Sequence, residues 1–138
     1  MTPSNKPPLV HHVSLNVSDF DKSKQFYTEL MAFLGRDIAL DFPGMYIGYD
    51  NCSFGLTKNR TEHPPTPTHL AFSATSNDQV DAFYNKAIAL GARCNGKPGL
   101  RTEYAPTYYA AFIHDFDGHN IEIVYIGNPD EYNYHDKK

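Results

Sequence analysis

The chain has 138 residues, the usual length of one compact domain with its own hydrophobic core. Its formal net charge is −4 and Lys and Arg do not cluster, so nucleic acid is not an expected partner. No stretch predicts a membrane span, and the N-terminal MTPSNKPP lacks the apolar run of a signal peptide. Cys52 and Cys94 are too few for a disulfide framework, so we expect reduced thiols and a cytoplasmic protein.

An internal repeat organises most of the chain. The segment HVSLNVSDFDKSKQFYTELMAFLG, which begins at His12, matches HLAFSATSNDQVDAFYNKAIALGA, which begins at His69. Two copies are too few for a solenoid, so a pair of similar modules is predicted, joined by the stiff segment HPPTP. The predicted boundaries are residues 9–126 for a single domain, 9–60 and 67–126 for its modules, and 1–8 and 127–138 for the tails.

The first module opens with a strand over residues 10–17, in which apolar side chains share one face and His12 lies on the other. A helix follows, with Ser18 or Asp19 as its N-cap and Gly35 at its C-terminal end. Three further strands are predicted over residues 38–41, 46–49 and 53–57.

The second module repeats this order. Its first strand covers residues 69–74, and its helix begins after Ser76 or Asn77 and ends at Gly91. A loop over residues 96–107 is expected to border a cavity. Three strands are predicted over residues 93–95, 108–114 and 120–126, the last two joined by a hairpin turn at Asp117-Gly118.

Strand phase brings three metal-binding side chains to the concave side of the predicted strands. His12 and His69 are equivalent in the repeat, and Glu122 points away from Ile121 and Ile123, which are apolar partners for a helix. Two imidazoles and one carboxylate form a three-ligand set that suits Fe(II), Mn, Zn or Ni. Each residue alone also fits a structural role, as a hydrogen-bonded histidine or as a carboxylate that is solvated or paired with Lys or Arg. Their equivalent placement favours the metal.

Three more residues are candidates for substrate binding. Arg101 lies in the predicted loop over residues 96–107, and its guanidinium matches the geometry of a carboxylate on a substrate, although a solvated loop role fits equally well. Tyr108 and Tyr109 are neighbours on one strand, so one of them is expected to face the cavity.

Three other histidines are expected to have structural roles. His11 is out of phase with His12 and is expected on the helix side of the strand or at its edge. His114 and His119 flank the predicted hairpin, where we expect turn and surface roles.

The strings HVSLNVSDFDKSKQFY, THLAFSA and HDFDGHNIEIVY resemble signatures of the vicinal oxygen chelate superfamily, and PGLRTEYAPTYYAAF resembles a glyoxalase-like branch of it. The resemblance implies an α+β fold in which two βαβββ modules form an incomplete mixed β-barrel around a divalent metal ion. It carries the ligand positions onto His12, His69 and Glu122, and makes Glu122 the catalytic candidate. It also implies a homodimer in which the site can be shared between chains.

One departure from the family pattern narrows the expected function. Glyoxalase I and the related epimerase use a fourth protein ligand, and the matching position here falls at or next to Gly55. The resemblance therefore implies a metal-dependent lyase, dioxygenase or thiol transferase with three ligands, acting on a small oxygen-rich substrate. The alternative is a protein that binds a drug-like ligand without chemistry, like the bleomycin-resistance relatives.

Overall fold

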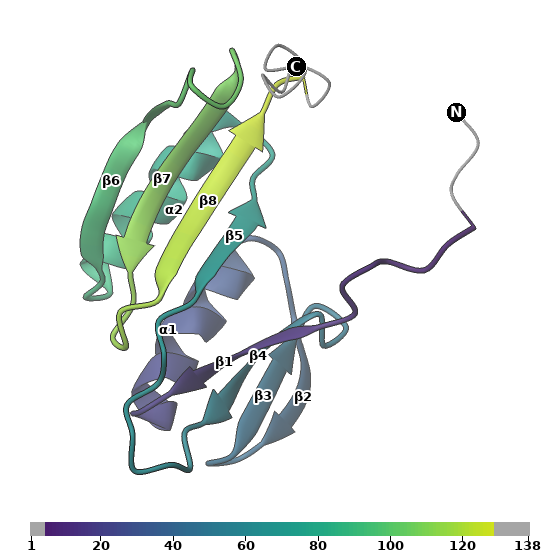
Figure 1. Cartoon of the computed structure of the whole chain (residues 1–138), viewed down its shortest axis with the longest axis vertical. Helices are drawn as coiled ribbons and strands as arrows, with labels where there is room; N and C mark the ends of the chain where they lie inside the picture. The colour runs from purple at the N-terminus through teal and green to yellow at the C-terminus, as the bar shows by residue number, and fades with distance from the viewer. Residues whose placement is uncertain (1–4, 129–138) are drawn as a thin grey trace. The chain divides into compact units, whose positions relative to one another are not determined.

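The computed structural model describes residues 5–128 and divides the chain into two compact units, Met1–Thr61 (unit 1) and Glu62–Lys138 (unit 2). Each unit runs βαβββ, which confirms the predicted α+β class (Figure 1). Residues 1–4 and 129–138 of the predicted tails lie outside the described residues. Neither helix within residues 5–128 is long and apolar enough to span a membrane.

Unit 1 holds a four-stranded mixed sheet in the order β1-β4-β3-β2. β1 and β4 pair in parallel, and the other two pairs are antiparallel. Parallel pairing needs a crossover connection, which α1 and the two intervening strands supply. The elements are β1 (Val13–Val17), α1 (Phe20–Phe33), β2 (Ile38–Phe42), β3 (Tyr46–Tyr49) and β4 (Phe54–Lys58).

The sequence of α1 accounts for its ends and its buried face. The Asp19 side chain caps the helix by accepting a hydrogen bond from the Lys22 backbone N–H at 3.2 Å. After the helix, Gly35 adopts a φ of 74°, which a residue with a Cβ reaches only at a cost. Tyr27 and Leu30 are fully buried at helical spacing, so this face of α1 belongs to the core.

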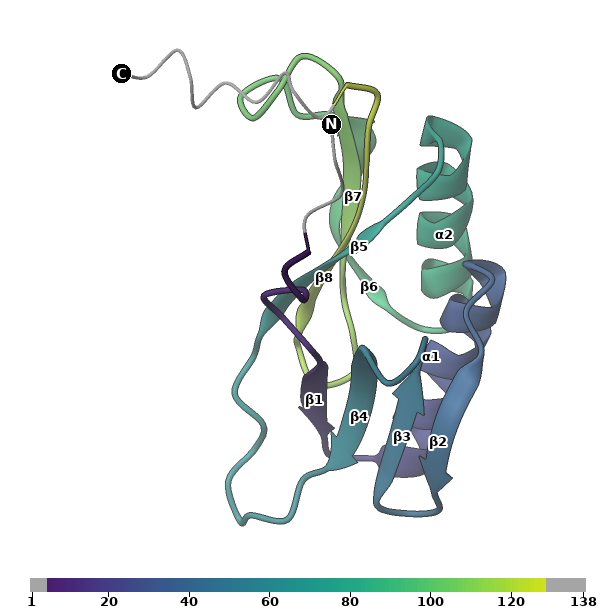
Figure 2. The ribbon, with the colours of Figure 1, turned by 90° about the vertical axis from the view of Figure 1, so that its right-hand side faces the viewer.

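Unit 2 repeats the topology with the order β5-β8-β7-β6, in which β5 and β8 are parallel. Figure 2 shows α2 along one face of this sheet. β6 continues to Leu100, so the predicted loop over residues 96–107 is shorter than expected and begins at Arg101. The elements are β5 (His69–Ser73), α2 (Asn77–Ala89), β6 (Arg93–Leu100), β7 (Tyr108–His114) and β8 (Asn120–Ile126).

Tyr49, the last residue of β3, is expected to make the free energy of unfolding depend on pH under alkaline conditions. Its side chain is fully buried, and its hydroxyl lies 2.7 Å from the Thr28 hydroxyl. Burial, with a smaller contribution from the charge of Asp41, raises the pKa of Tyr49 to about 12.

The unfolded chain releases the Tyr49 proton near the ordinary tyrosine pKa of about 10, before the folded chain does. The stabilising contribution of the neutral hydroxyl is therefore complete below pH 10 and is lost as the pH rises to about 12. We expect the free energy of unfolding in urea to fall over this range, and to fall less steeply in Tyr49→Phe. An identical slope in both proteins would show that another group controls the alkaline loss.

Candidate metal centre

Parallel pairing of β5 with β8 brings His69 and Glu122 to one face of the unit 2 sheet. Ala71 lies opposite Glu122 in this ladder. Side chains at alternate positions of a strand share a face, so His69, two residues before Ala71, projects on the side of Glu122. The Nε2 atom of His69 lies 3.1 Å from Oε1 of Glu122. Two of the three residues predicted as ligands are thus in contact.

The His69 ring is held in one orientation by the backbone. Its Nδ1 lies 3.0 Å from the carbonyl oxygen of Asn120, and because that oxygen can only accept, Nδ1 must be the donor. In the neutral ring, Nε2 then presents its lone pair to Oε1 of Glu122. Two acceptors this close repel each other unless a proton or a cation neutralises them. A carboxylate beside an imidazole fixed by a backbone carbonyl is a donor set that fits a divalent metal.

The second oxygen of Glu122 is occupied by a tyrosine. The Glu122 side chain is almost completely buried, and the Tyr108 hydroxyl from β7 donates a hydrogen bond to Oε2. A buried carboxylate is costly unless its charge is stabilised, and the hydroxyl offsets part of that cost. This bond leaves Oε1 as the oxygen that faces His69.

Tyr109 points to the opposite face of the sheet. Its hydroxyl donates to Oδ1 of Asp81 in α2 at 2.6 Å, and this bond to a carboxylate raises the pKa of Tyr109. The two tyrosines therefore divide between the faces, as strand alternation requires, and Tyr108 is the one beside Glu122.

Arg101 lies on the same face as His69 and Glu122. Its guanidinium carbon is 5.5 Å from the centre of the Phe112 ring, which stacks with the His69 ring at 6.4 Å between centroids. Phe112 is also the strand neighbour of Glu122 across β7 and β8. A hydrogen bond of 2.7 Å to the Lys97 carbonyl oxygen holds the guanidinium in place. The face thus carries a positioned cation beside the carboxylate and the imidazole.

His12, the third residue predicted as a ligand, belongs to unit 1 and directly precedes β1. Its Nδ1 lies 2.9 Å from Nδ1 of His11, and the two rings meet edge to face. The expected separation of these histidines is not observed, because both line one groove of unit 1. The strand begins only at Val13, so its alternation does not extend to them.

The pairing registers show which residue of unit 1 corresponds to Glu122. Ser14 of β1, which matches Ala71 in the repeat, lies opposite Gly55 of β4, as Ala71 lies opposite Glu122. Gly55 therefore occupies the position of unit 1 that is equivalent to Glu122 in unit 2. A Cβ atom there would lie 2.5 Å from the Tyr46 hydroxyl oxygen, so the Tyr46 side chain fills the space that a carboxylate would need.

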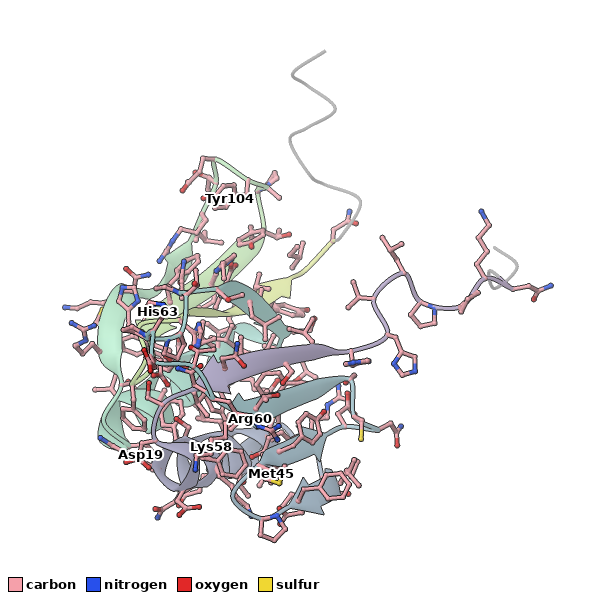
Figure 3. All side chains as sticks on the ribbon, turned by 60° about the horizontal axis from the view of Figure 1, so that its bottom comes forward. Asp19, Met45, Lys58, Arg60, His63 and Tyr104 are labelled. Carbon is pink, nitrogen blue, oxygen red and sulfur yellow. The ribbon has the colours of Figure 1, made fainter. Side chains whose placement is uncertain are left out.

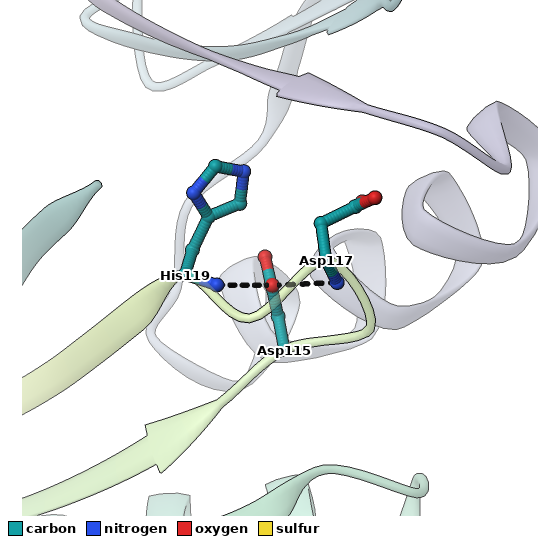
Figure 4. Close-up of side chains that lie close together, drawn as sticks. All are labelled: Asp115, Asp117 and His119. Atoms are coloured by element: carbon teal, nitrogen blue, oxygen red, sulfur yellow. Dashed lines mark hydrogen bonds between the residues drawn. The ribbon is translucent and has the colours of Figure 1, made fainter. Parts of the chain in front are cut away.

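A second group of potential ligand atoms lies in the turn between β7 and β8, at Asp115, Asp117 and His119 (Figure 4). Oδ1 of Asp115 accepts hydrogen bonds from the backbone N–H groups of Asp117 at 3.0 Å and His119 at 2.9 Å. Nδ1 of His119 accepts from the Thr68 N–H at 2.9 Å. Asp115 and His119 thus accept hydrogen bonds from backbone donors, so we interpret the cluster as a turn that fixes the hairpin.

The surface roles expected for the two hairpin histidines need correction. His119 is 1% exposed, because its ring reaches the Thr68 N–H at the start of unit 2. Nδ1 of His114 is buried and has no hydrogen-bond partner within residues 5–128. The Asp-rich string HDFDGHN signals the turn, but not its long-range partner.

Replacing Asp115 with Ala is expected to lower the free energy of unfolding by about 1–3 kcal/mol, because two buried N–H groups lose their acceptor. Asp115→Asn keeps an acceptor oxygen and is the matched control, with a smaller expected loss. Chemical denaturation measures both. Divalent-metal stoichiometry should be the same in both variants as in the parent, and a loss of metal binding in Asp115→Ala alone would move the metal site to this turn.

The chain matches known proteins over most of its length. A family model described as Glyoxalase/Bleomycin resistance protein/Dioxygenase superfamily matches residues 9–123. The metallothiol transferase FosB of Shouchella clausii is 27% identical over 118 residues, which cover 83% of this chain and 77% of that protein. A probable lactoylglutathione lyase of Vibrio parahaemolyticus is 29% identical over 123 residues, covering 82% and 87%.

A solved structure has a similar fold. The crystal structure of a glyoxalase/bleomycin resistance protein from Albidiferax ferrireducens aligns with a TM-score of 0.73 at 30% sequence identity. The alignment covers 85% of this chain and 98% of that chain.

Proposed function

Because the chain belongs to the Glyoxalase/Bleomycin resistance protein/Dioxygenase superfamily, we propose that it is a metal-dependent enzyme acting on a small oxygen-rich substrate. His12, His69 and Glu122 are the proposed metal ligands. The observation that carries this proposal is the contact between Nε2 of His69 and Oε1 of Glu122, 3.1 Å apart on one face of the sheet. An imidazole nitrogen and a carboxylate oxygen at this distance can serve as ligands of one divalent cation.

The similar proteins favour two reaction classes. One is named a metallothiol transferase and the other a probable lactoylglutathione lyase, so both names point to thiol-containing reactants. The glycine at position 55 removes the fourth ligand of the lactoylglutathione type of site, and Tyr46 fills its space. Transfer of a thiol to a substrate held by a three-ligand metal is therefore the favoured reaction, with the lyase and dioxygenase reactions as the other candidates.

The residues of unit 2 have distinct parts in this proposal. A bound divalent metal would act as a Lewis acid towards a substrate oxygen. Glu122 would offer Oε1 to that metal, while the hydrogen bond from Tyr108 to Oε2 limits rotation of the carboxylate. The Asn120 carbonyl fixes the ring of His69. Arg101, already positioned over Phe112, is suited to bind an anionic group of the substrate.

We further propose a homodimer as the functional form. The three ligands divide between the two units, His12 in unit 1 and the other two in unit 2. The same set can therefore be completed within one chain or between two chains. Sedimentation with and without metal, followed by mixing of a His12→Ala chain with a His69→Ala chain, distinguishes the two: activity recovers on mixing only when the site is shared between chains.

A substrate panel tests the proposed function. Metal-free protein is reconstituted with Mn, Zn, Ni or Fe(II), the last without oxygen, and assayed with fosfomycin plus thiol, glutathione hemithioacetals and catechols. We expect turnover of one class with one or two metals, its loss with chelator, and a fall in kcat/KM of at least about 100-fold in His69→Ala. His63→Ala, in the linker segment, is the matched control. Turnover that survives chelator and His69→Ala would overturn the proposal.

A non-catalytic role as a binding protein is the second candidate. The observation that favours it is a largely apolar groove in unit 1, lined in part by Leu40, Phe42 and Met45. Tight binding of a drug-like ligand that is unaffected by chelator, together with no turnover of the whole panel, would favour this role over the enzyme.

A further inference from the structure

Unit 1 carries a groove of about 610 Å³ on the face of its sheet that α1 does not cover. This volume lies within the range of pockets that hold small molecules, about 300–1,000 Å³. Tyr46 lines the groove and lies over the row where Gly48 of β3 pairs with Gly55 of β4. Neither glycine carries a side chain, so the Tyr46 ring lies across them: its hydroxyl oxygen is 3.2 Å from a Cβ position at Gly48 and 2.5 Å from one at Gly55.

One wall of the groove is built from large apolar side chains that remain exposed. Leu40 and Phe42 come from β2, and Met45, labelled in Figure 3, comes from the turn before β3. Their exposed fractions are 40%, 53% and 50%. A contiguous group of this kind is costly to leave in water and marks a binding surface more often than scattered apolar residues do.

The groove also contains one positively charged side chain. Arg60, labelled in Figure 3, lines it, and no Asp or Glu does. Within residues 5–128, Arg60 forms no ion pair, whereas Lys24 and Arg36 of the same unit are paired with Asp41 at 2.9 Å and Asp50 at 3.1 Å. The guanidinium is thus available to an anionic group from outside the described chain.

We propose that this groove binds a ligand with an apolar body and one anionic group, the body against Phe42 and Met45 and the anion on Arg60. The anion can be a carboxylate, a sulfonate or a phosphonate, since a guanidinium pairs with each. His12 lines the same groove. The further identification of this ligand as the substrate rests on the proposed function, in which His12 is a metal ligand, but the binding itself needs no metal.

Two fluorescent dyes of similar shape test the assignment on the metal-free full chain. One is 8-anilinonaphthalene-1-sulfonate, which carries a sulfonate, and the other is the uncharged N-phenyl-1-naphthylamine. We expect saturable binding of both, with one dye per chain. Arg60→Gln should weaken the sulfonate dye about tenfold, a typical effect of losing a charged partner, and change the uncharged dye less than about twofold.

Phe42→Ala should weaken both dyes about tenfold, because it removes apolar contact area. Phe42 is half exposed, so its replacement should not open the core, and we expect the thermal unfolding temperature of Phe42→Ala to equal that of the parent. Arg36→Gln is the matched charge control, because Arg36 is already paired with Asp50 and does not line the groove.

Three results would overturn the assignment. The first is an equal loss of affinity for the sulfonate dye in Arg60→Gln and Arg36→Gln. The second is unchanged affinity for both dyes in Phe42→Ala. The third is a groove that is closed by a second copy of the chain. The last would appear as dye binding that weakens as protein concentration rises, with Phe42→Ala shifting sedimentation to the monomer.

Glu122→Gln separates this inference from the proposed function. If the ligand site lies in the groove of unit 1, we expect this variant to bind both dyes with the affinity of the parent, whether or not the protein holds a metal. If the parent takes up no metal, but Arg60→Gln and Phe42→Ala weaken dye binding as expected, the proposed metal-dependent function is wrong and the ligand site in the groove is supported. If the protein binds metal and turns over a substrate, but dye affinity is unchanged in Arg60→Gln and Phe42→Ala, the proposed ligand site in the groove is wrong and the metal-dependent function is supported.

Discussion

Glu122→Gln is expected to weaken divalent-metal binding by at least about 100-fold and to abolish metal-dependent turnover. The substitution keeps the shape of the side chain but removes the charge that a divalent cation needs. Glutamine also offers an amide that Tyr108 can still bond, so the β7–β8 pair is retained. Calorimetric titration of the metal-free protein measures the affinity, and metal analysis after dialysis measures the stoichiometry.

Glu103→Gln is the control for this variant, because Glu103 is an exposed carboxylate in the loop after β6. It should bind metal as the parent does. The proposed centre would be contradicted if Glu122→Gln retained one metal per chain with unchanged affinity while remaining folded. The same would follow if both glutamine variants lost affinity equally, since that would point to a general effect of net charge.

Gly55→Glu, which places a carboxylate at the unit 1 position equivalent to Glu122, is expected to destabilise the fold by about 3 kcal/mol. A Cβ atom at Gly55 would lie 2.7 Å from the Ile47 carbonyl oxygen and 2.5 Å from the Tyr46 hydroxyl oxygen. The backbone atom cannot give way without disturbing the pairing of β3 with β4, whereas the Tyr46 side chain can move.

A double-mutant cycle separates these two contacts. Tyr46→Ala removes the side chain that covers Gly55, so the pair Tyr46→Ala/Gly55→Glu should lose less stability than the sum of the single variants. Urea denaturation gives the four free energies. Strict additivity, or no loss in Gly55→Glu alone, would show that the space over Gly55 is open and that sterics do not bar a fourth ligand.

Structural features that depend on neighbouring residues, or on the internal repeat, could be predicted from the sequence. The helix ends at Gly35 and Gly91 were predicted from residue type, and both residues adopt positive φ. The orientation of Glu122 followed from its neighbours Ile121 and Ile123, which are buried. Alternation along one strand and the capping of one helix depend on residues close in sequence, so a single chain reveals them.

The sequence was insufficient where pairing between distant residues decides the outcome. β6 extends through Gly96 and Gly99, two poor strand formers, because cross-strand bonds to β7 override local preference and accommodate two register shifts. The burial of His119 depends on Thr68, 51 residues earlier. The partner of Glu122 could not be chosen between Tyr108 and its neighbour, because the length of the intervening turn sets the phase.

Diffraction at the anomalous edge of a bound metal, from crystals grown with Mn or Zn, would locate the metal ion and its ligands. We expect one anomalous peak per chain within bonding distance of Nε2 of His69 and Oε1 of Glu122, with His12 of the same or a second chain as the third protein ligand. A peak at Asp115, Asp117 and His119 instead, or saturating metal with no peak beside Glu122, would contradict it.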